Sequence, residues 1–280
     1  MSCHPIGRFS CTMVLRMHRP HSAVLPRVAI VATALVILGT ACSSNGSSAT
    51  CGSGPKLLPS SPTALPTLDA HAFRQLLCQL HGKPVVMVIP CWVGDIDGGE
   101  RFVKPLKDFG SPVADLCTPK PFLTHQSMFD PSFVPGRWYY FKSCDVPELT
   151  DEVIDITMER SLQINSPLTS YPIWQMGGAV SRVEDGDTAF NGRQAGFTYN
   201  IGCATETEEG FADERDWVRS FWSALEPWHT TVYVNFLGDE GEERIRTAYG
   251  AKKYDRLKAL KQKYDPDNFF RINQNIPPAR

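Results

Sequence analysis

The sequence predicts an α+β fold, a mostly antiparallel sheet with helices on one face. Of the 280 residues, 42% are hydrophobic and 21% are charged, which is typical of globular domains. From residue 85 onward, short apolar strands alternate with amphipathic helices. The segment 197–203 alternates apolar and polar side chains, as a strand with one covered face does. The second face of such a sheet is free to cover something else.

Charge and cysteine spacing exclude several classes of function. Lys and Arg number 28 against 30 Asp and Glu, so the net charge is −2, whereas a nucleic-acid-binding surface needs clustered positive charge. The nine cysteines are scattered and form no Cys-x-x-Cys pair, which argues against zinc ribbons and dithiol redox motifs. We therefore expect no nucleic-acid partner, no metal site, and cysteines that mostly serve as small buried hydrophobic residues.

The first 41 residues have the features of a signal peptide. Arg16, Arg19 and Arg27 precede the apolar run Val28 to Leu38, which is shorter than the roughly 20 residues of a membrane-spanning helix. Small residues then lead to Cys42, and this junction resembles a bacterial lipoprotein cleavage site. We expect Cys42 to be lipidated and to anchor the mature chain on the extracytoplasmic side of a bacterial membrane. The alternatives are an uncleaved apolar anchor or, if the leader is not used, a cytoplasmic chain.

Residues 42–67 are rich in Ser, Gly, Pro and Thr and predict a flexible linker. The following segment, 68–89, combines a short helix over 70–77 with an apolar strand over 85–89. This order resembles the opening of secreted thioredoxin-like lipoproteins. Because Cys91 has no second cysteine close behind it, the redox chemistry of that family does not carry over.

The segment 90–230 contains the predicted strands and helices of the main sheet. Thr150 is expected to cap a helix that runs to about residue 163, since Asp151 and Glu152 follow it in the first turn. A second helix is expected around Val218 to Leu225, whose apolar residues recur at helical spacing. The other elements expected here are helices over 99–107 and 121–129 and strands over 138–143, 171–176 and 197–203.

The segment 231–280 is expected to begin with a strand and to end with one long helix. Within the predicted strand 231–237, Tyr233 and Asn235 would project from one face. The helix is expected to start near the acidic residues 239–243 and to end before Asp265-Pro266. Its buried side would carry four residues, namely Tyr254, Leu257, Leu260 and Tyr264.

The C-terminal residues resemble the corresponding module of berberine-bridge-enzyme-like, FAD-linked oxidoreductases. The residues that carry this resemblance are Tyr233-Val234-Asn235-Phe236, Tyr249-Gly250, Lys263-Tyr264-Asp265-Pro266-Asp267-Asn268 and Asn273-Gln274-Asn275-Ile276. Weaker matches upstream, Pro90 to Asp95 and Gly177-Gly178-Ala179, resemble the substrate domain of the same family. The resemblance therefore divides the C-terminal part of the chain into a substrate domain over 90–230 and a berberine-bridge-like module over 231–280.

The resemblance implies an oxidoreductase that binds FAD and removes a hydride from an alcohol, a sugar or an alkaloid-like substrate. Tyr233 matches the family tyrosine that accepts the substrate proton in several members, and Asn235 and Gln175 lie at positions that contact flavin or substrate. A tyrosine ionises near pH ~10, so it needs a neighbouring cation or hydrogen-bond donor to act as a base at neutral pH. Lys142 is one candidate for that cation.

The family's FAD domain carries a Gly-Gly-His loop that does not occur in this sequence. We therefore expect the chain to be the substrate half of such an enzyme, completed by a separate FAD-binding chain. One alternative is a non-catalytic, lipid-anchored binding protein that uses the free face of the sheet. Another is a rearranged chain without activity.

Overall fold

The computed structural model describes residues 85–109, 112, 114–127, 129–130 and 133–279, together with the backbone of three short strands near the N-terminus. These residues belong to two compact units. The first comprises 1–138, 164–170 and 204–207, and the second comprises 139–163, 171–203 and 208–280. The expected helix over 70–77 lies outside the described residues, as does Cys42.

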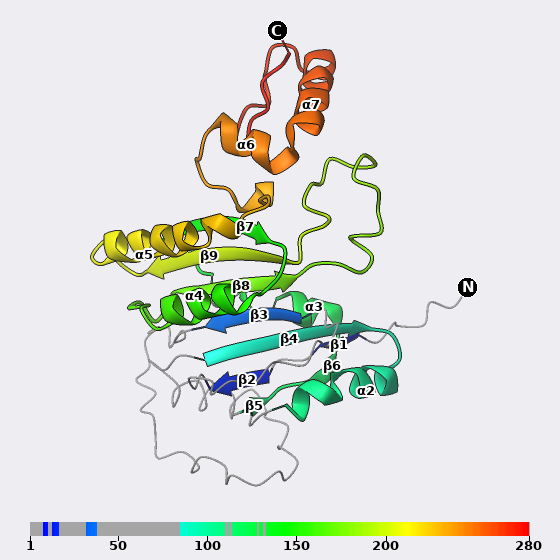
Figure 1. Ribbon diagram of the computed structural model, residues 1–280, viewed down its shortest axis with the longest axis vertical. Coiled ribbons are helices and arrows are strands. Elements are labelled where there is room, and N and C mark those ends of the chain that lie inside the picture. The colour runs from blue at the N-terminus through cyan, green and yellow to red at the C-terminus, as the bar shows by residue number, and fades with distance from the viewer. Residues whose placement is uncertain are drawn as a thin grey trace. The chain divides into compact units, whose positions relative to one another are not determined.

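The sheet of the first unit is built around β4 (Val85–Val93), which extends the strand expected over 85–89. Its apolar residues alternate between buried and half-buried, and β4 pairs antiparallel with each of its neighbours. Those neighbours are β1 (Arg8–Ser10), β2 (Met13–Arg16) and β3 (Ala32–Ile37), shown with β4 in Figure 1. Two short strands, β5 (Ala114–Asp115) and β6 (Thr118–Lys120), pair antiparallel with β2 and β1.

The helices of the first unit start at local signals in the sequence. In α2 (Ile96–Lys107) the Asp95 carboxylate accepts a hydrogen bond from the Gly98 amide, which satisfies one of the free N–H groups of the first turn. The expected helix over 99–107 is therefore confirmed and starts three residues earlier. The helix expected over 121–129 is shorter and forms α3 (Phe122–Gln126).

The second unit confirms the predicted arrangement of helices on one face of a sheet. Its strands are β7 (Trp138–Val146), β8 (Ser170–Gln175) and β9 (Phe197–Thr205), in the order β8-β9-β7 (Figure 1). The helices α4 (Asp151–Ser161) and α5 (Phe211–Ala224) cover one face. Tyr171 of β8 and Tyr199 of β9 both meet the edge of the Phe221 ring of α5, and all three side chains are fully buried.

The predicted cap of α4 is also confirmed. The Val153 amide donates to Thr150 Oγ1 over 3.3 Å, and Asp151 and Glu152 occupy the first turn, where the helix dipole favours negative charge. A buried hydroxyl network then ties the helix to the sheet, since Thr157 bonds the Tyr199 hydroxyl over 3.0 Å. These contacts hold the helices on one face of the sheet, while the opposite face carries buried polar residues such as Thr198 and Asp145.

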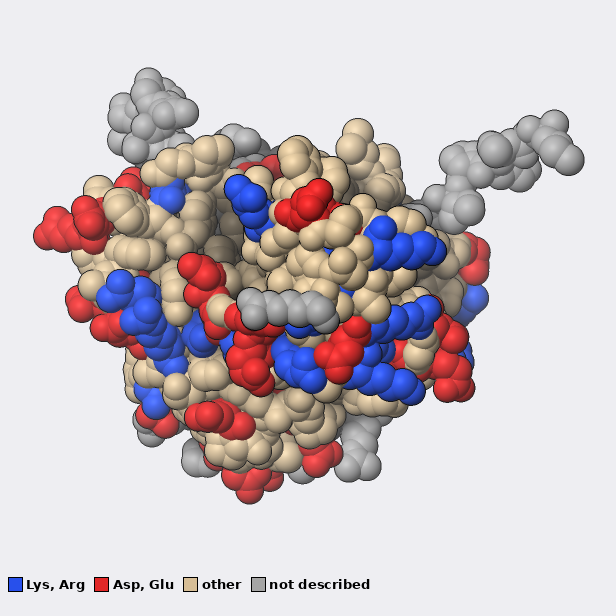
Figure 2. All heavy atoms as spheres, turned by 90° about the horizontal axis from the view of Figure 1, so that it is seen from above, with Lys and Arg blue, Asp and Glu red and all other residues tan. Residues whose placement is uncertain are grey.

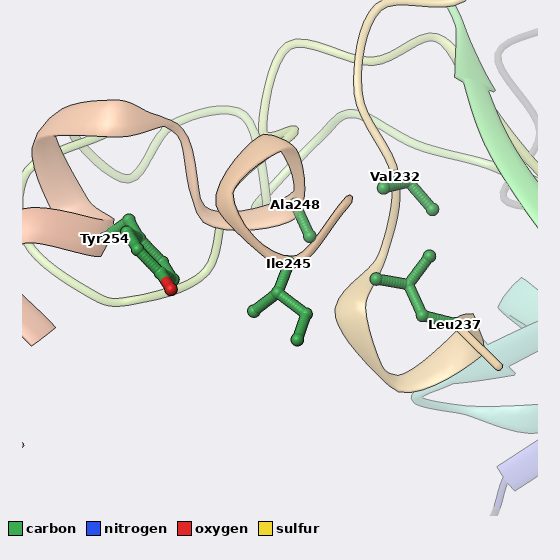
Figure 3. Packing of buried hydrophobic residues seen from close by; sticks show 5 residues of the cluster. All are labelled: Val232, Leu237, Ile245, Ala248 and Tyr254. Carbon is green, nitrogen blue, oxygen red and sulfur yellow. The ribbon is translucent and has the colours of Figure 1, made fainter. Parts of the chain in front are cut away.

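The strand expected over 231–237 is wrong. The segment forms one 3₁₀ turn, η3 (Val234–Phe236), after a second short turn, η2 (Glu226–Trp228). Its apolar residues do not alternate between two faces, because Val232 and Leu237 both enter one cluster with Ile245, Ala248 and Tyr254 (Figure 3). The segment is therefore shaped by what it packs against rather than by strand pairing.

The single long helix expected after residue 239 is also wrong. The structure has two helices, α6 (Glu242–Tyr249) and α7 (Ala251–Tyr264), which meet at Gly250 with φ +74° and ψ 146°. Tyr254 is buried as expected, but Leu260 is 43% exposed and Tyr264 is 73% exposed. The change of direction at Gly250 turns the end of α7 away from the cluster that buries Tyr254.

No helix among the described residues combines the length and the apolar character that a membrane-spanning segment requires. Figure 2 shows acidic and basic side chains interspersed on one face of the molecule. Ion pairs of the C-terminal helices include Lys253–Asp185, which reaches the loop between β8 and β9, and Arg246–Asp255.

Candidate functional site

The two residues expected at the site from the C-terminal motif, Tyr233 and Asn235, are in direct contact. The Asn235 side-chain amide donates a hydrogen bond to the Tyr233 hydroxyl oxygen over 2.6 Å. They meet because the chain turns through η3 directly after Tyr233, and not because they share a strand face. An N–H group aimed at a phenol oxygen is a contact that stabilises negative charge on that oxygen.

Aromatic rings surround this pair on one side. Tyr233 meets Phe236 edge to face at 5.0 Å between ring centroids, and Phe236 stacks on Trp174 of β8 at 5.0 Å and 19°. Phe190, from the long loop between β8 and β9, lies 5.8 Å from the Tyr233 ring. We call Trp174, Phe190, Tyr233 and Phe236 the aromatic wall. Lys253 of α7 holds the loop that carries Phe190 by donating to the Phe190 carbonyl over 2.7 Å.

Gln175, the third residue expected at the site, has no contact with Tyr233 or Asn235 that the structure records. Side chains alternate along β8, so Gln175 shares the face of Tyr171 and Ile173, which are buried on the helix-covered side. Trp174 projects to the opposite face, where it joins the aromatic wall. The assignment of Gln175 to flavin or substrate remains a prediction, and Trp174 is the site residue that the sequence reasoning missed. The alternation along β8 could have found it, because Trp174 falls on the face opposite Tyr171, Ile173 and Gln175.

Polar groups accompany the wall on the face of the sheet opposite the helices. Asn200 alternates with the helix-facing Tyr199 along β9, and its Oδ1 atom is buried without a hydrogen-bond partner among the described residues. On β7, Asp145 accepts a hydrogen bond from Thr198 over 2.6 Å. Burial raises the pKa of Asp145 to about 6, because desolvation disfavours its charged form.

Lys142 does not face Tyr233. Its ammonium group pairs with Glu240 at 2.5 Å and lies 4.3 Å from the centroid of the Trp222 ring. Arg244 lies over the same ring, and His229 packs against it at 4.7 Å. Burial, together with the positive charge of Arg244, lowers the pKa of His229 to about 4. The side chain that contacts the Tyr233 hydroxyl is therefore the amide of Asn235, and not the candidate ammonium group of Lys142.

Two of the described cysteines, Cys144 and Cys203, are buried thiols. Desolvation raises the pKa of both thiols, so they are not the thiolates that react or bind metals. This confirms the expectation of buried hydrophobic cysteines for these two. In the described part of the chain, no group of three or more His, Cys, Asp or Glu side chains is placed to hold a metal ion.

The arrangement combines apolar aromatic rings with one hydroxyl that can exchange a proton. Tyr233 is half-buried, and its oxygen already accepts one N–H group. Chemically, such a site can stack against a planar ring and transfer a proton at the Tyr233 hydroxyl.

Comparison with known proteins identifies the segment that carries this site. Residues 232–277 match the family described as "Berberine and berberine like". A FAD-linked oxidoreductase from Dictyostelium discoideum is 26% identical over 210 residues, which cover 74% of this chain and 46% of that protein. The FAD-linked oxidoreductase YvdP from Bacillus subtilis is 33% identical over 186 residues, 64% of this chain and 41% of that protein. The chain thus spans less than half the length of these relatives.

The fold is similar to that of solved flavoprotein structures. The crystal structure of 6-hydroxy-D-nicotine oxidase from Arthrobacter nicotinovorans superposes with a TM-score of 0.65 at 16% identity, covering 98% of this chain and 56% of that one. The berberine-bridge-enzyme-like protein 1 of Physcomitrella patens gives a TM-score of 0.64 over 99% of this chain. Residues 232–277 therefore form a berberine-like module, in a chain whose sequence is similar to FAD-linked oxidoreductases and whose fold is theirs in part.

Proposed function

We propose that this chain is the substrate half of a FAD-dependent oxidoreductase of the berberine-bridge-like type, acting on an alcohol, a sugar or an alkaloid-like molecule. The observation that carries the proposal is the hydrogen-bonded pair Tyr233 and Asn235 beside the aromatic wall. This pair lies inside the segment that matches the family, and relatives over a wider part of the chain are FAD-linked oxidoreductases.

The residues present fit the ring end of a flavin. The stacked pair Trp174 and Phe236 offers apolar surface to a planar ring, and the unpaired Oδ1 atom of Asn200 offers a buried acceptor to a ring N–H. The pyrophosphate end needs backbone N–H groups of the kind that glycine-rich loops supply, and the Gly-Gly-His loop of the family does not occur in the sequence. We therefore propose a separate FAD-binding chain as the partner of this one.

In this proposal the chain's own residues bind the substrate and move one proton. Bound FAD would supply the hydride acceptor. Tyr233 would accept the proton of the substrate hydroxyl or amine, and the Asn235 N–H group would stabilise the negative charge on the Tyr233 oxygen before the transfer. The aromatic wall would orient the substrate and exclude water from the Tyr233 hydroxyl.

Co-production of the full chain with the part of YvdP outside the matched region tests the proposal. We expect a complex of the two chains with the visible absorption of oxidised flavin. In that complex, Tyr233→Phe should keep the colour but slow flavin reduction by about 100-fold or more, because it removes the proton acceptor. Tyr264→Phe is the matched control, since this exposed tyrosine lies outside the wall, and its rate should equal that of the unaltered complex.

The test uses alcohols, oligosaccharides and benzylisoquinoline-type amines as substrates, with the flavin absorption followed under anaerobic conditions. A colourless mixture, with the two chains eluting separately, would contradict the proposed partnership. A coloured complex in which Tyr233→Phe reduces flavin at the unaltered rate would contradict the role of Tyr233 alone.

The N-terminal segment adds a proposal about location. We propose that the chain is carried across a bacterial membrane and anchored there through a lipid on Cys42. The support is in the sequence, where an apolar run and small residues lead directly to Cys42.

A further inference from the structure

The turn that carries the candidate site is too short to hold its own shape. Its backbone has two internal hydrogen bonds, from the Phe236 amide to the Tyr233 carbonyl over 2.9 Å and from the Leu237 amide to the Val234 carbonyl over 3.2 Å. A single 3₁₀ turn is not stable in isolation, because two hydrogen bonds do not offset the entropy lost when the turn is ordered. The orientation of Tyr233 and Asn235 therefore depends on contacts made from outside the turn.

The N-terminal side of the turn is fixed by β7. The Asp145 amide donates to the Thr231 carbonyl over 2.8 Å, and the Thr230 amide donates to the Asp145 carbonyl over 2.9 Å. Asn191, in the long loop after β8, adds a hydrogen bond to the Thr231 hydroxyl over 3.2 Å. The chain thus enters the turn from a backbone position that the sheet determines.

The C-terminal side is fixed by one side chain from the end of the chain. The Gln274 amide nitrogen donates to two successive carbonyls, that of Leu237 over 2.8 Å and that of Gly238 over 3.0 Å. Both hydrogens of the amide are used, and both acceptors directly follow the turn. Ile276, two residues further on, packs against the cluster that contains Val232 and Leu237.

We infer that Gln274 is a positioning residue, which sets the orientation of Tyr233 and Asn235 by fixing the carbonyls of Leu237 and Gly238. This inference rests on the proposed function for its catalytic meaning, but the positioning itself is a property of the chain alone. It assigns to Gln274 a task at the site, beside the packing of Ile276 in the hydrophobic cluster of the module.

Hydrogen exchange in the full chain tests the inference, with Gln274→Glu as the main variant. A carboxylate has the same shape as the amide but cannot donate, so it would place negative charge against two carbonyl oxygens. We expect the amides of Phe236 and Leu237 to exchange about 10- to 100-fold faster, while those of the last turns of α7 stay within about twofold. Gln262→Glu is the matched control, because it makes the same charge change at an exposed position of α7 and should leave both groups of amides unchanged.

A second readout follows the site itself. With tyrosine labelled by ¹³C at the ring carbon that bears the hydroxyl, the Tyr233 signal is assigned by its loss in Tyr233→Phe. It should shift or broaden in Gln274→Glu, whereas the signal of the buried Tyr254 in the same module should not. Gln274→Met, which removes the donors without adding charge, covers the case in which the glutamate variant does not fold.

The outcomes separate the inference from the proposed function. Unaltered exchange and an unaltered Tyr233 signal in Gln274→Met would overturn the inference, and so would faster exchange spread evenly over α6, α7 and the turn, since that is the signature of a purely structural role. Failure to bind flavin, alone or with a partner chain, would count against the proposed function and would leave these two measurements standing.

Discussion

At the scale of single residues, the buried Asp145 and the half-buried His229 have opposite effects on how stability depends on pH. Burial raises the pKa of Asp145 to about 6, so the folded state binds a proton that the unfolded state has released above about pH 4. Stability from this group therefore falls as the pH rises from 4 to 6. Burial lowers the pKa of His229 to about 4, so the unfolded state holds the extra proton below about pH 6.5. Stability from His229 therefore rises over nearly the same window.

The pH dependences of Asp145 and His229 partly cancel in the unaltered chain, so each should become visible when the other residue is substituted. Asp145→Asn keeps the acceptor for Thr198 and removes the titration. The difference in the free energy of unfolding between this variant and the unaltered chain should therefore rise by about 2–3 kcal/mol from pH 4 to pH 6. His229→Phe keeps a ring against Trp222 and should give a change of the opposite sign. Urea unfolding at half-unit pH steps measures both, and a variant whose curve runs parallel to that of the unaltered chain would show that its group does not titrate in this window.

At the scale of elements, the break between α6 and α7 depends on the backbone of Gly250. With φ +74° and ψ 146°, Gly250 adopts a backbone conformation that is strained for any residue with a Cβ atom. Space is not the obstacle, because an added methyl group would meet only Asn191, at 3.6 Å. We expect Gly250→Ala to lower the free energy of unfolding by about 1–3 kcal/mol. Gly186→Ala is the control, since φ there is not positive and no atom lies within 4 Å of the added methyl, and its effect should stay within about 0.5 kcal/mol. Equal effects of the two substitutions would mean that strain at Gly250 is not what separates the helices.

The elements also show which parts of the fold a sequence can predict. The sequence correctly predicts the cap at Thr150 and the strand β9, because their causes lie within a few residues of one another, but β9 is largely buried on both faces instead of one. The segment 231–237 has the same apolar alternation as a strand, but among the described residues its backbone bonds to a strand only at its start, through Asp145 of β7. Gln274 contacts the other end, and both residues are distant in the sequence. In the same way, the sequence predicts Tyr233 and Asn235 as site residues, whereas their hydrogen bond and the packing of Trp174 on Phe236 needed the folded chain.

At the scale of the whole molecule, the apolar segment near the N-terminus can be either a strand of the fold or a cleaved leader, but not both. In the full chain, β3 (Ala32–Ile37) pairs antiparallel with β4, with Ala34 opposite Val88 and Val36 opposite Val86. The same residues are the apolar run of the proposed leader, so cleavage before Cys42 would remove β3, together with β1 and β2, from the mature protein. The strand β4 would then lose the partners on both of its edges, and an unpaired, apolar edge strand favours new pairing or association.

We expect the proposed processing to occur in a bacterium that lipidates secreted proteins, with a mature mass that begins at a lipid-modified Cys42. A single acyl chain binds membranes weakly, and lasting attachment takes more than one. A Cys42 that carries more than one acyl chain should therefore keep the protein in the membrane fraction. Cys42→Ser should abolish incorporation of radiolabelled palmitate and retain the leader, whereas Cys51→Ser, nine residues further on, should change neither. A chain that keeps residues 1–41 and fractionates identically with both substitutions would mean that 32–37 serves as a strand of the fold instead of a leader, and that the pairing of β3 with β4 is the arrangement of the mature protein.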